Sequence, residues 1–203
     1  MFNFEKTPGY KMNRLWLRAA EKLTFHDPTK YLMQLRRLET EIALSNAEPK
    51  IKALRTNPLK ETREQRQAAL FCHGMGERLG HKVYFATQED QDYDFIASWI
   101  IDEVRHFAAV QLKEVVPAET NPRASMENIL AGLKKYTDSD GLTVAIHLNQ
   151  AGRFEPDLLQ LLDLKVGSLW VFGSVTPDQS SWNLWGNFTE SEPYGTQFSY
   201  PAV

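Results

Sequence analysis

The sequence predicts an α/β fold in which helices flank a mixed central sheet. Segments with helical spacing alternate with short runs rich in aromatic and β-branched residues, in the order α-β-β-β-α-β-α-β. Three strand-like runs follow one another before a helix intervenes, and this order predicts an antiparallel meander followed by crossover connections. The chain of 203 residues is long enough for one main domain with a sizeable core and an appendage.

Composition divides the chain into three parts. We expect a basic helical N-terminal segment over residues 1–60, an α/β core over residues 61–175 and an aromatic-rich extension over residues 176–203 that packs on the core. Residues 1–66 carry 14 Lys and Arg against 8 Asp and Glu, a balance of +6, whereas residues 67–203 carry 9 against 18, a balance of −9. A basic segment beside an acidic domain suggests contact with a polyanion, and a helical appendage with solvated side chains explains the charge equally well.

Two helices are expected in the N-terminal segment, over Met12–Leu23 and Lys30–Ser45, because their apolar residues recur at helical spacing. Pro28 lies between them and marks the break, since proline disfavours a helical residue before it.

The core is expected to begin with a helix over Glu61–Leu79, with Thr62 as its N-cap and Gly80 as its C-terminal stop. The remaining elements follow from β-branched runs, helical spacing and turn residues. The expected strands are His81–Ala86, Phe95–Ile101, Phe107–Val116, Leu142–Leu148 and Ser168–Val175, and the expected helices are Ser125–Tyr136 and Pro156–Leu164.

The C-terminal extension places six aromatic residues among polar and turn residues. We interpret it as an extended segment that packs these rings onto the core. A platform for nucleobases is the weaker interpretation, because the extension has no Lys or Arg to follow phosphates. The six are Trp182, Trp185, Phe188, Tyr194, Phe198 and Tyr200.

The segment Tyr93–Val116 carries the most informative pattern. The charged break Asp102–Arg105 in this segment is a candidate hairpin turn. In such a hairpin, two residues face each other across the strands when their numbers sum to about 207, so Asp94 would lie opposite Lys113. Gln111 is two residues from Lys113 and shares its face of the sheet. An acid, an amide and an ammonium would then lie together beside a hydrophobic sheet, which is costly unless the group has a function.

This α-β-β-β-α-β order, with an acid at the start of the second strand and an x-Leu-Lys triplet in the third, resembles the PD-(D/E)xK nuclease superfamily. The resemblance covers about residues 61–175 and implies the restriction-endonuclease-like fold. It implies that Asp94 and Gln111 bind a metal ion and that Lys113 assists the attacking water and the phosphate. Glu77, near the end of the preceding helix, matches a further glutamate that many members add.

The chemistry of these residues agrees with such roles. Phosphodiester hydrolysis needs neutralised phosphate oxygens, a positioned water and a stabilised leaving group. Glu77, Asp94 and the side-chain carbonyl of Gln111 offer the oxygen ligands that Mg²⁺ or Mn²⁺ prefers. We therefore expect a metal-dependent nuclease that acts on nucleic acid, with DNA as the expected partner, in DNA processing, restriction or mobile elements. The resemblance also suggests a homodimer, since many such nucleases cut two strands as dimers.

Two departures from the family pattern leave an alternative open. Tyr93 replaces the proline of the motif, and Gln111 replaces its acid, which removes one negative charge and some metal affinity. A catalytically degenerate module that binds nucleic acid or a protein is therefore an alternative to the enzyme. A small α/β interaction protein is a third alternative. Convergence of Asp94, Gln111 and Lys113 at one pocket would favour the nuclease or the binding module over this third alternative.

Other functional classes are disfavoured by composition. Cys72 is the only cysteine, so no internal disulfide or multi-cysteine zinc site can form, and we expect a reducing, cytoplasmic location. No apolar run approaches the roughly 18 residues of a membrane span, and the N-terminus lacks the apolar core of a signal peptide, so no membrane partner is expected.

Overall fold

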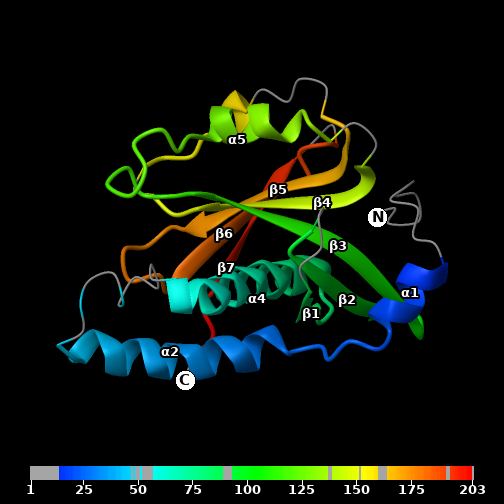
Figure 1. The fold of residues 1–203 in the computed structure, drawn as a ribbon, viewed down its shortest axis with the longest axis horizontal. Helices are drawn as coiled ribbons and strands as arrows, with labels where there is room; N and C mark the ends of the chain where they lie inside the picture. The colour runs from blue at the N-terminus through cyan, green and yellow to red at the C-terminus, as the bar shows by residue number, and fades with distance from the viewer. Residues whose placement is uncertain are drawn as a thin grey trace.

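A seven-stranded mixed sheet forms the centre of the molecule (Figure 1). The computed structural model describes residues 14–46, 48, 51, 57–88, 93–136, 139–150, 152–159, 164–190 and 193–202. The strands lie in chain order across the sheet as β1 (Tyr84–Thr87), β2 (Phe95–Ile101), β3 (Val104–Val115), β4 (Ser139–Leu148), β5 (Val166–Ser174), β6 (Ser181–Gly186) and β7 (Tyr194–Ser199). The helices are α1 (Arg14–Ala20), α2 (Pro28–Leu44), α4 (Lys60–Leu79) and α5 (Met126–Leu133), with short 3-10 turns η2 (Asn57–Leu59) and η3 (Pro156–Leu158).

The strand directions confirm the α/β class and the mixed sheet. β1, β2 and β3 form an antiparallel meander, and β3, β4 and β5 are parallel. β6 and β7 return to antiparallel pairing. The element order α4-β1-β2-β3-α5-β4 is the order expected for the core. Because β2 runs against β1 and β3, the end of β1, the start of β2 and the ends of β3 to β5 share one edge of the sheet.

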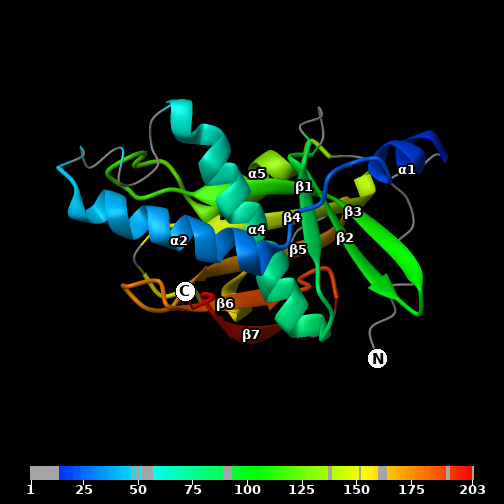
Figure 2. The ribbon, with the colours of Figure 1, turned by 90° about the horizontal axis from the view of Figure 1, so that it is seen from below.

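Helices cover both faces of the sheet. α5 lies on one face, α4 lies on the other, and α2 lies outside α4 (Figures 1 and 2). Alternation along the strands supplies an apolar layer to each side. Leu112 of β3 belongs to the cluster under α4 with Phe71, whereas Val144 of β4 belongs to the cluster under α5 with Leu133. Burying each such side chain contributes about 1.5–3 kcal/mol.

The β2–β3 hairpin is tighter than expected. Its turn consists of Asp102 and Glu103, whose φ angles of 48° and 65° are both positive, as a type I′ turn requires. The expected register was therefore wrong by two residues, and the residue opposite Asp94 is Gln111, not Lys113. A shift of two residues keeps every side chain on its face, so the expected grouping on one face is unaffected.

Helix α4 begins and ends within one residue of its expected bounds. Gly80 terminates it with φ of 68°, a left-handed conformation that glycine adopts without a steric penalty. Thr62 is not its N-cap, which was wrong: Leu59 occupies the N-cap position and no side chain caps the helix. Its 20 residues span about 30 Å, so its two ends lie over different parts of the sheet.

Helix α2 packs directly against α4. Its start is fixed by Asp27, whose side chain accepts a hydrogen bond from the backbone N–H of Lys30, and by Pro28 in the first turn. Leu32 is fully buried and Leu35 is nearly so, which places this helix in the same core as the sheet.

The C-terminal extension forms the last two strands, β6 and β7. The rings of Trp182 and Phe198 are buried and stack with centroids 6.4 Å apart. The hydroxyl of Tyr200 donates to the backbone carbonyl of Leu32 at 3.2 Å, which ties the end of the chain to α2. The extension forms regular strands, in which the rings of Trp182 and Phe198 are buried and that of Tyr194 is exposed.

The second expected crossover helix, Pro156–Leu164, is only a short 3-10 turn, η3, where the structure describes it, and residues 160–163 lie outside the described residues. None of the described helices combines the length and the apolar character that crossing a membrane requires.

Candidate functional site

Asp94 lies immediately before β2 and is tightly held by β3. Its backbone N–H donates to the carbonyl of Val110 at 2.9 Å. Its Oδ2 accepts hydrogen bonds from the backbone N–H of Leu112, at 2.6 Å, and from Nε2 of Gln111. Both hydrogen bonds end on the same carboxylate oxygen, so the side chain has one fixed orientation.

Gln111 connects Asp94 to Tyr136, which lies three residues beyond the end of α5. Its Oε1 accepts a hydrogen bond from the Tyr136 hydroxyl at 3.0 Å. Gln111 and Tyr136 are both buried. A carboxylate can only accept hydrogen bonds, so the amide nitrogen of Gln111 must face Asp94 and its carbonyl oxygen must face the phenol.

Lys113 lies on the same face of β3 as Gln111 and is partly buried. Burial lowers the pKa of its ammonium, and the nearby charge of Lys135 lowers it further, whereas the carboxylate of Asp94 acts to raise it. The structure therefore brings Asp94, Gln111 and Lys113 together at one place.

A cavity of about 500 Å³ opens beside Asp94 on the α4 side of the sheet. Carboxylates of two elements line it: Asp94 from β2, and Glu61 and Glu64 from the first turns of α4. Glu64 forms an ion pair with Lys60 at 3.4 Å, and Glu61 accepts a hydrogen bond from Gln65 at 3.0 Å.

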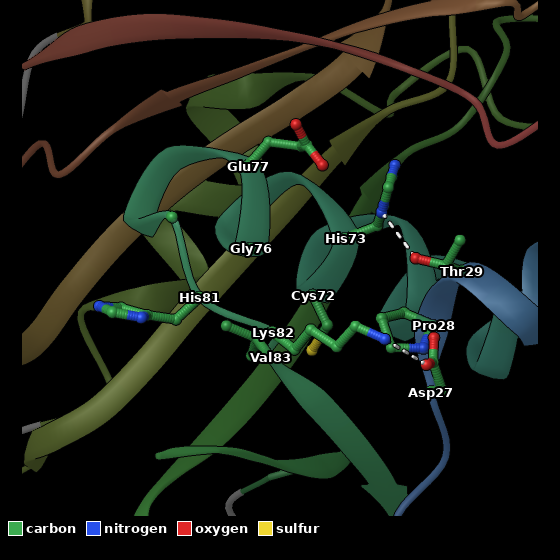
Figure 3. Close-up of a pocket in the computed structure, with 11 residues that line it drawn as sticks. Asp27, Pro28, Thr29, Cys72, His73, Gly76, Glu77, His81, Lys82 and Val83 are labelled. Atoms are coloured by element: carbon green, nitrogen blue, oxygen red, sulfur yellow. Dashed lines mark hydrogen bonds and ion pairs between the residues drawn. The ribbon is translucent and has the colours of Figure 1, made fainter. Parts of the chain in front are cut away.

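Glu77 does not join this site. It lines a separate pocket of about 300 Å³ at the other end of α4 (Figure 3). The charged groups near it are already paired there: Lys82 with Asp27 at 3.2 Å, and His73 with Thr29 at 3.3 Å.

The direction of α4 explains why Glu77 was the wrong glutamate to pair with Asp94. The C-terminal end of α4 leads into the start of β1, whereas Asp94 lies at the opposite end of that strand. Glu64 and Glu77 are 13 positions apart, which is about 20 Å along a helix. The first half of α4 is therefore the part that reaches Asp94.

The oxygen ligands of the cavity suit a hard divalent cation. Mg²⁺ keeps several waters and needs only one or two carboxylates, which Asp94 and a glutamate of α4 can provide. Within the part of the chain that the structure describes, no group of three or more His, Cys, Asp and Glu side chains is arranged to hold a metal ion. The donor set thus fits a water-rich Mg²⁺ or Mn²⁺ site and does not fit a zinc site.

Two other chemically interesting groups have structural roles. Cys72 is fully buried, and burial raises the pKa of its thiol, so it is not a nucleophile. His147 is buried on β4, stacks on Phe172 with centroids 5.0 Å apart and hydrogen-bonds Gln67 through Nδ1 at 3.2 Å. It is a satisfied histidine of the core.

Sequence reasoning missed Glu64, Glu61 and Tyr136. For Glu64 a signal existed: it lies one helical turn before Ala68, on the buried side of α4, and a helix that precedes a strand packs antiparallel to it. For Tyr136 there was none, because it meets Gln111 across 25 residues of chain.

Comparison of this chain with protein-family models, with curated proteins and with solved structures finds no match.

Proposed function

We propose that this protein is a metal-dependent nuclease whose active site is built from Asp94, Lys113 and Glu64. One observation carries the proposal: a rigidly held carboxylate, Asp94, lies beside a partly buried lysine and lines an open cavity with further carboxylates. Such an arrangement is costly in a core unless it serves binding or catalysis.

Each side chain has a definite role in this proposal. Asp94 and Glu64 would hold the divalent cation. When bound, a divalent ion neutralises the phosphate oxygens and lowers the pKa of a coordinated water. Lys113 lies near Asp94 without lining this cavity, and its ammonium supplies positive charge that attracts the phosphate to be cleaved. Lys135 adds positive charge near Lys113.

We further propose that the core belongs to the restriction-endonuclease-like folds. The support is the order α4-β1-β2-β3-α5-β4, the position of Asp94 at the start of β2 and the position of Lys113 near the end of β3. DNA is the proposed substrate.

The test is cleavage of supercoiled plasmid, single-stranded DNA and RNA by the full chain with Mg²⁺, with Mn²⁺ and with chelator. Removing one carboxylate of a metal site lowers cleavage strongly, so Asp94→Asn and Glu64→Gln should each lose at least about 100-fold, an amount worth about 2.7 kcal/mol. Glu77→Gln is the matched control on the same helix and should cleave like the wild type. Equal losses in Glu64→Gln and Glu77→Gln, or cleavage that persists in Asp94→Asn, would contradict the proposal.

A catalytically degenerate binding module is the second candidate. It is favoured by the amide at Gln111, which stands where the family pattern has an acid, and by the absence of a three-residue metal-binding group among the described residues. Binding of DNA without cleavage under every metal condition would select this candidate.

A further inference from the structure

We infer that Gln111 positions Asp94 and is not itself a ligand of the metal, and that Tyr136 fixes it in this role. The inference rests on the proposed function and specifies which atoms of that site meet the cation. It departs from the role that the resemblance implies for Gln111.

The first argument is the direction of the hydrogen bonds. Tyr136 donates to Oε1 of Gln111, and Nε2 of Gln111 donates to Oδ2 of Asp94. The two ends of the amide are not interchangeable, because the carboxylate offers no proton. The only side-chain oxygen of Gln111 therefore already accepts a hydrogen bond from the phenol, and turning the amide would place that oxygen against the carboxylate.

The second argument is the location of these groups. Gln111 is 8% exposed and Tyr136 is 7% exposed, and neither lines the cavity beside Asp94. Asp94 and Leu112 do line it, on the side of α4. The amide thus lies behind the carboxylate as seen from the cavity, where it can orient the carboxylate but cannot reach a cation in front of it.

The arrangement also explains why an amide suits this position. Oδ2 of Asp94 is occupied by two N–H donors, while Oδ1 receives no hydrogen bond from the described residues and remains for the cation. A carboxylate at position 111 would lack the donor and would repel Asp94 at close range in a buried place. Gln111 therefore keeps Asp94 aimed at the cavity.

The test compares two tyrosines whose hydroxyls donate hydrogen bonds. Tyr136→Phe removes the hydrogen bond to Gln111. Tyr200→Phe removes a hydrogen bond to the backbone carbonyl of Leu32 at 3.2 Å, and neither residue lines the cavity. Mn²⁺ affinity of the full-length variants is measured by calorimetric titration, with a thermal melt to confirm that each is folded.

On our inference, Tyr136→Phe weakens Mn²⁺ binding about 10-fold, the size typical of losing a residue that orients a metal ligand, and Tyr200→Phe leaves it unchanged. If the hydrogen bond from Tyr136 to Gln111 does not support Asp94, Tyr136→Phe binds Mn²⁺ as tightly as the wild type or more tightly. That outcome overturns the inference and leaves the proposed function intact. Wild-type protein that binds no Mn²⁺, or an Asp94→Ala variant that binds it normally, overturns both.

A measurement on the wild type needs no variant. In NMR spectra, the hydrogen-bonded NH₂ proton of Gln111 should resonate downfield, because it faces a carboxylate, and saturating Mg²⁺ should leave it there. Movement to the position of a solvated glutamine amide on Mg²⁺ addition would show that the amide turns toward the cation, and would overturn the inference.

Discussion

At the scale of single residues, the site depends on how neighbouring strands hold one carboxylate. Strand alternation in the sequence was enough to predict that Asp94, Gln111 and Lys113 share a region of the sheet, because alternation does not depend on the length of the turn. It was not enough to predict which residue faces Asp94, since that required the two-residue turn at Asp102 and Glu103. The contact with Tyr136 could not be predicted at all, because it joins two elements through tertiary packing.

We expect the protein to lose stability at high pH because of two tyrosines, Tyr31 and Tyr200. Burial raises the pKa of Tyr31 and of Tyr200 to about 12, with nearby carboxylates, Glu39 among them, adding to the effect. Because the folded pKa exceeds the unfolded value of 10.0, the folded state holds its protons longer, and stability that is complete below pH 10 is lost as the pH rises toward 12. Chemical denaturation at a series of pH values should show this fall.

The variant that removes both hydroxyls isolates their contribution to this fall. Tyr31→Phe with Tyr200→Phe should cost about 1 kcal/mol per lost hydrogen bond at neutral pH, and should flatten the fall between pH 10 and 12. A double variant that loses stability over this range as steeply as the wild type would contradict the assignment to these residues.

At the scale of elements, α4 decides which residues can meet. The sequence predicted its bounds well, because Gly80 ends it and its apolar spacing is regular. It did not show which end of the helix approaches Asp94, and the family resemblance pointed to Glu77. The packing direction of a helix on a sheet is a property of the connection to the next strand, and here the short link to β1 requires an antiparallel arrangement.

The packing of α4 on β7 gives a test of this arrangement. A Cβ atom added at Gly74, in the middle of α4, would lie 2.7 Å from Cε1 of Phe198. Alanine in place of glycine in a helix gains about 1 kcal/mol, whereas overpacking a core costs about 1–3 kcal/mol. We therefore expect Gly74→Ala to be destabilising by about 1 kcal/mol, with a melting temperature lower by about 2–4 °C.

The substitution Phe198→Leu tests whether the ring of Phe198 causes the destabilisation by Gly74→Ala. Once the ring is absent, Gly74→Ala should become neutral or stabilising in a double-mutant cycle of unfolding free energies. Equal destabilisation by Gly74→Ala in both backgrounds would mean that Phe198 is not what the added methyl group meets.

At the scale of the whole molecule, charge is distributed unevenly along the chain. The basic residues are concentrated in the first 66 positions, whereas the remainder of the chain is acidic. Deleting the N-terminal segment would not test its role, because Leu32 of α2 is fully buried in the core. Exposed cations on that helix can be changed without disturbing the packing.

Reversing the charge of Lys30 and Arg37, both exposed on α2, should weaken DNA binding in a salt-dependent way. Each phosphate contact contributes about 0.9 to the slope of log K against log salt, so losing two contacts flattens the slope by up to about 1.8. The matched control reverses the exposed Arg153 and Lys165, away from α2, and should leave the slope unchanged. Identical slopes in both double variants, measured by fluorescence anisotropy on one duplex, would mean that α2 makes no contact with DNA.

The central claim is that a divalent cation binds between Asp94 and the first half of α4, and locating Mn²⁺ in crystals of the full chain tests it most directly. The anomalous signal of Mn²⁺ gives its position without reference to activity. We predict a single strong peak in the cavity lined by Asp94 and Glu64, within about 2.0–2.2 Å of a carboxylate oxygen of Asp94, as expected for small hard cations. No peak beside Asp94 at saturating Mn²⁺, or a peak only in the pocket of Glu77, would contradict the account.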